Sequence, residues 1–151
     1  MNKPEPYDLH SGLGYRLTLA ARINQQGFER LLAQIGITRQ MWCVLVAVGN
    51  MNISLPTEIA KYIGINRTSA SRSLRQMAQK GLVERLSKSG DGRTNPITLT
   101  DKGRETLEAS IPMAHKAQDN LRRRLSLEEQ DQLSDLLGKL MQGDTPPVAG
   151  I

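Results

Sequence analysis

Apolar and small side chains recur at every third or fourth position from Leu9 to Ile35. This spacing places them on one face of an α-helix of about seven turns. A second apolar set widens that face, so the helix needs partners on more than one side. Gly36 is expected to end it. The first set is Leu9, Leu13, Leu17, Ala20, Asn24, Phe28, Leu31 and Ile35, and the second is Tyr15, Leu19, Ile23 and Leu32. Asn24 has two interpretations: a buried residue that sets the register between two copies of the helix, or a partly exposed one.

The next helix follows Thr38, a suitable N-cap residue, and its sequence RQMWCVLVAVGNM is too continuously apolar for a surface helix. We therefore expect it in the core, with Trp42 and Cys43 as packing residues. A redox role for Cys43 would require an exposed thiolate of low pKa, and no His is adjacent to it.

Two shorter helices separated by a tight turn are predicted after Ser54. Pro56 suits the first turn of a helix that ends at Gly64, and Asn66 is a good N-cap for a helix running to about Lys80. Only Gly64 and Ile65 separate the two helices. This is the spacing of a helix-turn-helix.

The second of these helices has one apolar and one polar face at one hundred degrees per residue. Ala70, Leu74 and Met77 are expected to point into the domain. The opposite face carries hydrogen-bond donors and positive charge but no acid, as a helix that enters the DNA major groove requires. The candidate DNA-binding residues on it are Thr68, Ser69, Ser71, Arg72, Arg75 and Gln79. A solvated polar face, the alternative, usually mixes Glu with Lys and Arg.

Short strands are predicted at residues 82–86 and 97–99, joined by the glycine-containing segment SKSGDGRTNP. A hairpin after a helix-turn-helix makes a winged helix. Lys88 and Arg93 flank its tip, where a thin cationic loop suits the minor groove, and Asp91 could hold the Arg93 guanidinium in position. An ordinary surface loop is the competing interpretation.

The C-terminal third is predicted to be helical. Thr100 is the expected cap of a helix whose apolar stripe runs to Leu125 through Pro112, which is expected to kink it. Ser126 and Glu129 form a capping-box pattern for a last, leucine-rich helix. These helices lack enough partners within one chain, so we expect them to pack across a twofold axis. The tail 143–151 is expected to be disordered.

The formal charge of +5 is concentrated in residues 55–100, which hold eight Lys and Arg against three Asp and Glu. The rest of the chain is neutral, so an anionic partner is expected for this segment. Only five residues are aromatic, which favours duplex DNA over single strands or RNA that stack bases on aromatic platforms. The single cysteine and the lack of an eighteen-residue apolar run predict a cytoplasmic protein without a membrane partner.

With these motifs in view, residues 7–142 resemble the MarR family of bacterial winged-helix transcriptional regulators. The resemblance rests on TEIAKYIGINRTSASRSLRQMAQKGLVER and on DGRTNPITLTDKG, which is similar to the family's wing and its LT-x-x-G helix start. Gly92 stands where the family often has a second basic residue. The resemblance implies a single domain, mainly α with a small β-hairpin: a winged helix-turn-helix at 38–100 flanked by dimerisation helices at 7–36 and 101–142.

The resemblance further implies a homodimer that binds a pseudo-palindromic operator in double-stranded DNA and acts as a repressor relieved by a small aromatic or anionic effector. Such effectors lodge where the dimerisation helices meet the winged helix, which singles out Tyr15, Arg16 and Trp42, although each also has an ordinary packing or surface explanation. A winged helix used only for protein interaction is the alternative. The sequence predicts no enzyme, cofactor or metal site, because His10, His115 and Cys43 lie on separate elements.

Overall fold

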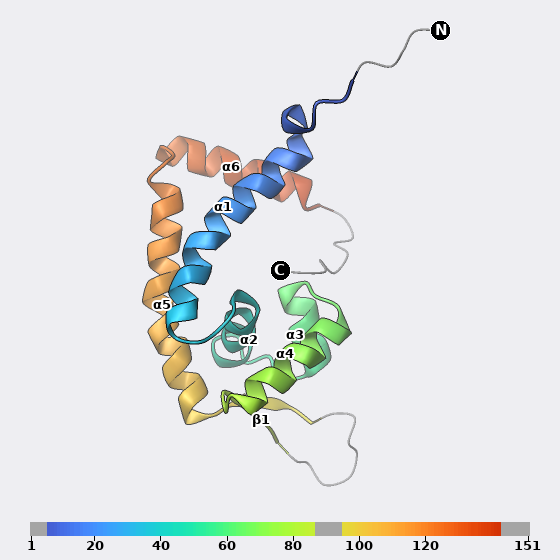
Figure 1. Cartoon of the computed structure of the whole chain (residues 1–151), viewed down its shortest axis with the longest axis vertical. Helices are drawn as coiled ribbons and strands as arrows, with labels where there is room; N and C mark the ends of the chain where they lie inside the picture. Colours follow the sequence, from blue (N-terminus) through green and yellow to red (C-terminus); the bar gives the residue numbers. More distant parts are fainter. Residues whose placement is uncertain (1–5, 87–94, 143–151) are drawn as a thin grey trace, which may run out of the picture.

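The computed structural model describes residues 6–86 and 95–142 of the chain, in the order η1, α1, α2, α3, α4, β1, β2, α5, α6. The predicted fold class, mainly α with a small hairpin, is confirmed. The helix α1 (Leu13–Gln34) lies beside α5 (Asp101–Arg122), and α6 (Leu127–Leu140) leaves α5 at the end of the molecule opposite the hairpin (Figure 1).

The helix α2 (Arg39–Gly49) forms the centre of the core, as its sequence predicts, and it contacts α1, α3, α4, α5 and β2. Its buried residues are Met41, Val44, Leu45, Ala47 and Val48. The hydroxyl of Thr38 accepts a hydrogen bond from the backbone N–H of Met41, which is the predicted N-cap. Phe28 and Leu32 are the only buried residues that α1 contributes, so just its C-terminal half packs onto this core.

The helix-turn-helix consists of α3 (Pro56–Ile63) and α4 (Arg67–Gln79). Gly64 has φ +73°, in the left-handed region that glycine tolerates, and it ends α3. The N–H of Ile65 then returns to the carbonyl oxygen of Ala60 at 3.0 Å. Ala60, Ile65 and Ala70 form a small buried cluster, so the small side chain of Ala60 lets the two helices cross closely.

The strands β1 (Val83–Arg85) and β2 (Ile97–Leu99) pair antiparallel, with Val83 opposite Leu99. Both of these residues are buried and anchor the hairpin to the core. The hydroxyl of Thr100 accepts from the N–H of Gly103 at 3.0 Å and caps α5. A Cβ on Gly103 would collide with the carbonyl oxygen of Leu82, which explains the glycine at this helix start.

Three details refine the sequence interpretation. The first long helix begins at Leu13 rather than Leu9, because Gly12 is extended and separates it from the short 3₁₀ helix η1 (Leu9–Ser11). The helix α5 runs on through Pro112 as one element. The expected tail 143–151 lies outside the described residues.

The capping box of Ser126 and Glu129 is formed, but α6 buries none of its residues. Large apolar side chains on it are exposed instead: Leu127, Leu133, Leu136, Leu137, Leu140 and, just beyond it, Met141. Further exposed apolar side chains lie on the first half of α1, at Leu13, Leu19 and Ile23. These two helices therefore extend from the core with much of their apolar surface uncovered.

Candidate nucleic-acid interface

The helix α4 presents the polar face that its sequence predicts. Ala70, Leu74 and Met77 are buried, together with Ser73, while the opposite face is open to solvent. The side-chain oxygen of Asn66 accepts from the N–H of Ser69 at 2.8 Å and caps the helix. The exposed candidates on this face are Thr68, Ser71, Arg72, Arg75 and Gln79.

The first two and a half turns of α4, roughly, border a shallow basic depression. Arg67, Thr68, Ser71, Arg72 and Arg75 line about 390 Å³ of it. Arg67 is not among the residues expected from the sequence; its signal is a basic residue directly after the N-cap. Free backbone N–H groups and the positive end of the helix dipole also favour an anion at this end. The depression therefore has the charge and the donors for phosphate groups of DNA.

Ser69 differs from the other candidates because it faces α2 and is half-buried. The amide Nε2 of Gln40 donates a hydrogen bond to its carbonyl oxygen. Ser69 also lines a cavity of about 300 Å³ between α2 and α4, together with Arg39, Gln40 and Arg72. Its position ties the start of α4 to α2.

The candidate wing residues Lys88, Asp91 and Arg93 lie outside the described residues. The base of the wing is described: the N–H of Leu86 donates to the carbonyl oxygen of Pro96 at 2.9 Å, beyond the last paired residues of the two strands. The N–H of Ile97 donates to the carbonyl oxygen of Ser54 at 2.8 Å. The hairpin is thereby joined to the segment that leads into α3.

The three candidate effector residues do not come together within one chain. Trp42 packs its indole ring edge-to-face on Phe28, with ring centroids 4.8 Å apart. Tyr15 precedes Phe28 by 13 residues on the same helix, a separation of about 20 Å along its axis. Tyr15 instead contacts His10, and Arg16 is exposed.

Trp42 lines a cavity of about 360 Å³ between α1, α2 and α5. Phe28, Ala114 and Leu121 supply apolar walls, and Arg39 and His115 supply polar groups. The Nε of Arg39 and the Nε1 of Trp42 are buried without a hydrogen-bond partner in the described structure. Buried donors are normally satisfied, so these two groups mark a place where an acceptor would be stabilised.

Cys43 follows Trp42 and is half-buried. Burial raises the pKa of its thiol above the ordinary value of 9.0, and the positive charge of Arg39 offsets this only in part. The thiol is therefore protonated at neutral pH, in agreement with its interpretation as a packing residue.

Within residues 6–86 and 95–142, no three His, Cys, Asp or Glu side chains are grouped as metal ligands. No single helix of the described ranges is long and apolar enough to cross a membrane. Only the bent pair of α1 and α2, taken together across an angle of 77°, has both the length and the composition of such a span.

Comparison with known proteins connects this geometry to one family. A family model described as "MarR family" matches residues 35–94. The transcriptional repressor MprA of Escherichia coli (strain K12) is 31% identical over 115 residues, which are 75% of this chain and 65% of MprA.

Two solved structures share the fold. CouR, a transcriptional repressor bound to p-coumaroyl-CoA, has a TM-score of 0.80 and 26% identity, over 93% of this chain and 99% of CouR. A mutant MarR from E. coli complexed with operator DNA has a TM-score of 0.78 and 24% identity, over 85% of this chain and 93% of that one. The family match over residues 35–94, the curated relative and the shared fold all point to the MarR family.

Proposed function

We propose that the chain is a dimeric, sequence-specific regulator of transcription that binds double-stranded DNA in the cytoplasm. The exposed face of α4 carries this proposal, because it combines Arg72, Arg75 and Gln79 with short donors near the helix start and contains no acid. MprA is a repressor, and the MarR structure contains operator DNA, which favours repression through an operator for this chain as well.

A second copy of the chain is the partner that the uncovered helices favour. The leucines of α6 and the first half of α1 form more exposed apolar surface than scattered single residues would. Pairing about a twofold axis would bury this surface and hold two α4 helices at the spacing of two half-sites. We therefore propose that residues 7–36 and 101–142 form the dimerisation helices and that residues 38–100 form the winged helix-turn-helix.

The Trp42 cavity is the proposed effector site. An aromatic or apolar group fits beside Phe28 and Leu121, and a carboxylate would accept from Arg39 and Trp42, whose buried donors lack partners. CouR shows a relative with a bound aromatic thioester. In this proposal Tyr15 and Arg16 lie outside the site formed by one chain. Because Trp42 is the single tryptophan, its fluorescence reports ligand binding directly.

The test is selection of genomic fragments bound by the purified protein, followed by affinity measurements at several salt concentrations. We expect a pseudo-palindromic site and an affinity that falls steeply as salt rises, because Lys and Arg displace counterions from phosphates. A flat salt dependence would contradict DNA binding through this face. Failure to shift any fragment at low salt would favour the protein-interaction module instead.

A further inference from the structure

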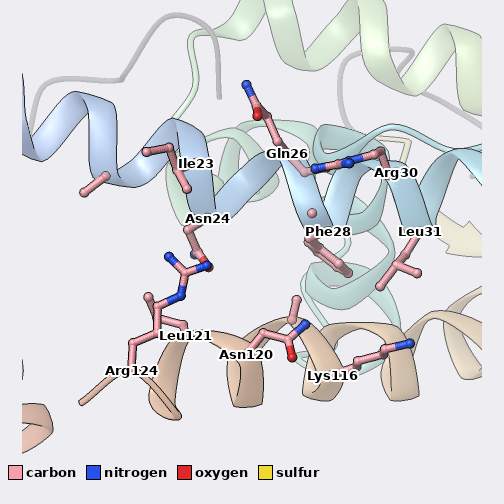
Figure 2. A pocket seen from close by; sticks show the side chains of 13 residues that line it. Ile23, Asn24, Gln26, Phe28, Arg30, Leu31, Lys116, Asn120, Leu121 and Arg124 are labelled. Atoms are coloured by element: carbon pink, nitrogen blue, oxygen red, sulfur yellow. The ribbon is translucent and has the colours of Figure 1, made fainter.

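A second cavity lies between α1 and α5 and receives no residue from α2 or α4. Its volume is about 520 Å³, which is within the usual range of about 300–1,000 Å³ for small-molecule sites. It shares Asn24, Phe28, Ala117 and Leu121 with the Trp42 cavity, so these residues separate the two spaces. We call this second cavity the α1/α5 groove (Figure 2).

The groove is basic. Arg30 of α1 and Lys116 and Arg124 of α5 line it, and no Asp or Glu does. Lys116, Asn120 and Arg124 follow one another at intervals of four, which places them on one face of α5. In the described ranges the one ion pair is that of Arg104 with Asp101, so no described carboxylate neutralises the three cations of the groove.

The positions of these groups suit a ligand with a negative charge. In Figure 2 the Arg124 side chain points from α5 toward Asn24 of α1, and Asn120 points into the space between the helices. The Nε of Arg30 donates to the carbonyl oxygen of Gln26 at 3.2 Å, which holds the guanidinium at the rim. Cations from both helices therefore border one opening.

The floor of the groove is apolar. Ile23, Phe28, Leu31 and Leu121 contribute to it, and the Phe28 ring points into the space between the helices (Figure 2). Trp42 supports that ring from the other side. A bound molecule would thus meet an apolar surface below and positive charge at the edge.

Gly27 lines the groove on its α1 side. It lies in the interior of α1, where glycine is less favourable than alanine, and a Cβ at this position would meet no atom within 4 Å. Close packing in the described chain therefore does not require a glycine here. Its missing side chain leaves the α1 wall of the groove open.

We propose that the α1/α5 groove binds an amphipathic organic anion, with an aromatic or aliphatic body on the Phe28 floor and a carboxylate or sulfonate among Arg30, Lys116 and Arg124. This site is additional to the Trp42 cavity. It does not depend on DNA binding, and it is tested on the full chain without DNA.

The probe is 8-anilinonaphthalene-1-sulfonate, titrated by fluorescence, with uncharged N-phenyl-1-naphthylamine as its matched neutral probe. Lys116→Gln combined with Arg124→Gln should weaken binding of the sulfonate about tenfold or more, because charge-assisted contacts are lost. Binding of the neutral probe should stay within about twofold, since the apolar floor is intact. Arg22→Gln, an exposed cation on α1 that does not line the groove, is the control.

Gly27→Leu provides a steric test that does not weaken the helix, because leucine is a better helix former than glycine. It should weaken both probes, whereas the charge variant affects only the sulfonate. None of Gly27, Lys116 and Arg124 lines the Trp42 cavity, so these losses would locate the probe in the groove. Unchanged sulfonate affinity in both variants would overturn the proposal. So would a shifted monomer–dimer equilibrium with unchanged probe binding, which would make the groove an interface between two copies.

Discussion

The side-chain amide of Gln40 and the carbonyl oxygen of Ser69 are joined by a hydrogen bond of 3.2 Å between α2 and α4. Gln40 lies in the first turn of α2, whose apolar residues are fixed in the core, and Ser69 lies in the first turn of α4. The bond therefore connects the most buried helix with the start of the helix proposed to enter the major groove. Gln40 also follows Arg39 in the chain, and Arg39 lines the Trp42 cavity.

Gln40→Ala should lower the free energy of unfolding by about 1 kcal/mol, the usual net contribution of one hydrogen bond. DNA affinity should fall by about threefold to tenfold, because α4 would be held less firmly in its binding orientation. Urea unfolding and fluorescence anisotropy with a selected DNA fragment measure the two effects. Gln34→Ala, at an exposed position at the end of α1, is the control. Equal DNA affinity for Gln40→Ala and the control would show that the bond does not position α4.

Arg72→Ala and Arg75→Ala should each weaken binding to the selected site by about 1–3 kcal/mol if their guanidinium groups contact base edges. Arg67→Ala should instead weaken all sequences alike and reduce the salt slope by about 1, as expected for a phosphate contact. Arg93→Ala, in the wing predicted from the sequence, should also weaken binding while leaving the proposed dimer intact. Competition experiments with mismatched fragments distinguish these cases. Arg22→Ala is the control, and wild-type affinity in both Arg72→Ala and Arg93→Ala would refute the site assignment.

Leu136→Glu combined with Leu140→Glu should dissociate the proposed dimer, because two charges would be placed in the apolar surface of α6. Sedimentation equilibrium measures the change in association. The fold of each chain should be retained, since α6 buries no residue in the described protomer. Ser134→Glu adds charge to the same helix and is the control. An unchanged dimer in the double variant would exclude α6 from the interface.

Gly103→Ala should destabilise the fold by about 1–3 kcal/mol or more, because the added Cβ collides with the backbone carbonyl oxygen of Leu82, directly before β1, which cannot move freely. Gly27→Ala should have the opposite effect and stabilise the chain by about 0.5–1 kcal/mol, since its Cβ enters open space in a helix. Thermal unfolding of both variants gives the comparison. Equal effects would mean that packing does not distinguish the two helical glycines.

The stability of the chain should decrease at alkaline pH partly through Cys43. Burial raises the pKa of its thiol, so the folded state retains the proton more strongly than the unfolded state does. This contribution is complete below the ordinary value of 9.0 and is lost as pH rises toward the higher pKa of the folded state. Urea unfolding at pH 8 and pH 10 should show a larger loss for the wild type than for Cys43→Ala. Equal losses would indicate that the thiol titrates normally.

Local features of the fold were predictable because they depend on residues three positions apart. The caps at Thr38, Asn66, Thr100 and Ser126 are formed as the sequence predicts. The buried face of α4 also follows from helical geometry alone.

Ser110 shows the limit of such patterns: it is fully buried, and its hydroxyl donates to the carbonyl oxygen of Leu107 at 2.6 Å. A hydroxyl that is hydrogen-bonded within its own helix can be buried without cost to the packing. The polar side chain of Ser110 therefore gave no signal in the sequence that this position is buried.

The candidate effector site was less predictable because it depends on how helices cross. The sequence places Tyr15 and Trp42 in one candidate site because it does not reveal where α1 crosses α2. Phe28 fixes that point beside Trp42 and leaves Tyr15 about 20 Å away along α1. The basic groove of Lys116 and Arg124 could not be inferred either, since its other wall comes from a helix some 90 residues earlier in the chain.

Phe28 gives the two cavities a common wall, and this has a thermodynamic consequence. A molecule that displaces the ring from the groove side changes the shape of the space beside Trp42, and the reverse holds equally. Linkage then requires each ligand to alter the affinity of the other by the same factor. A single aromatic side chain would in this way let one helix pair combine two chemical signals into one response.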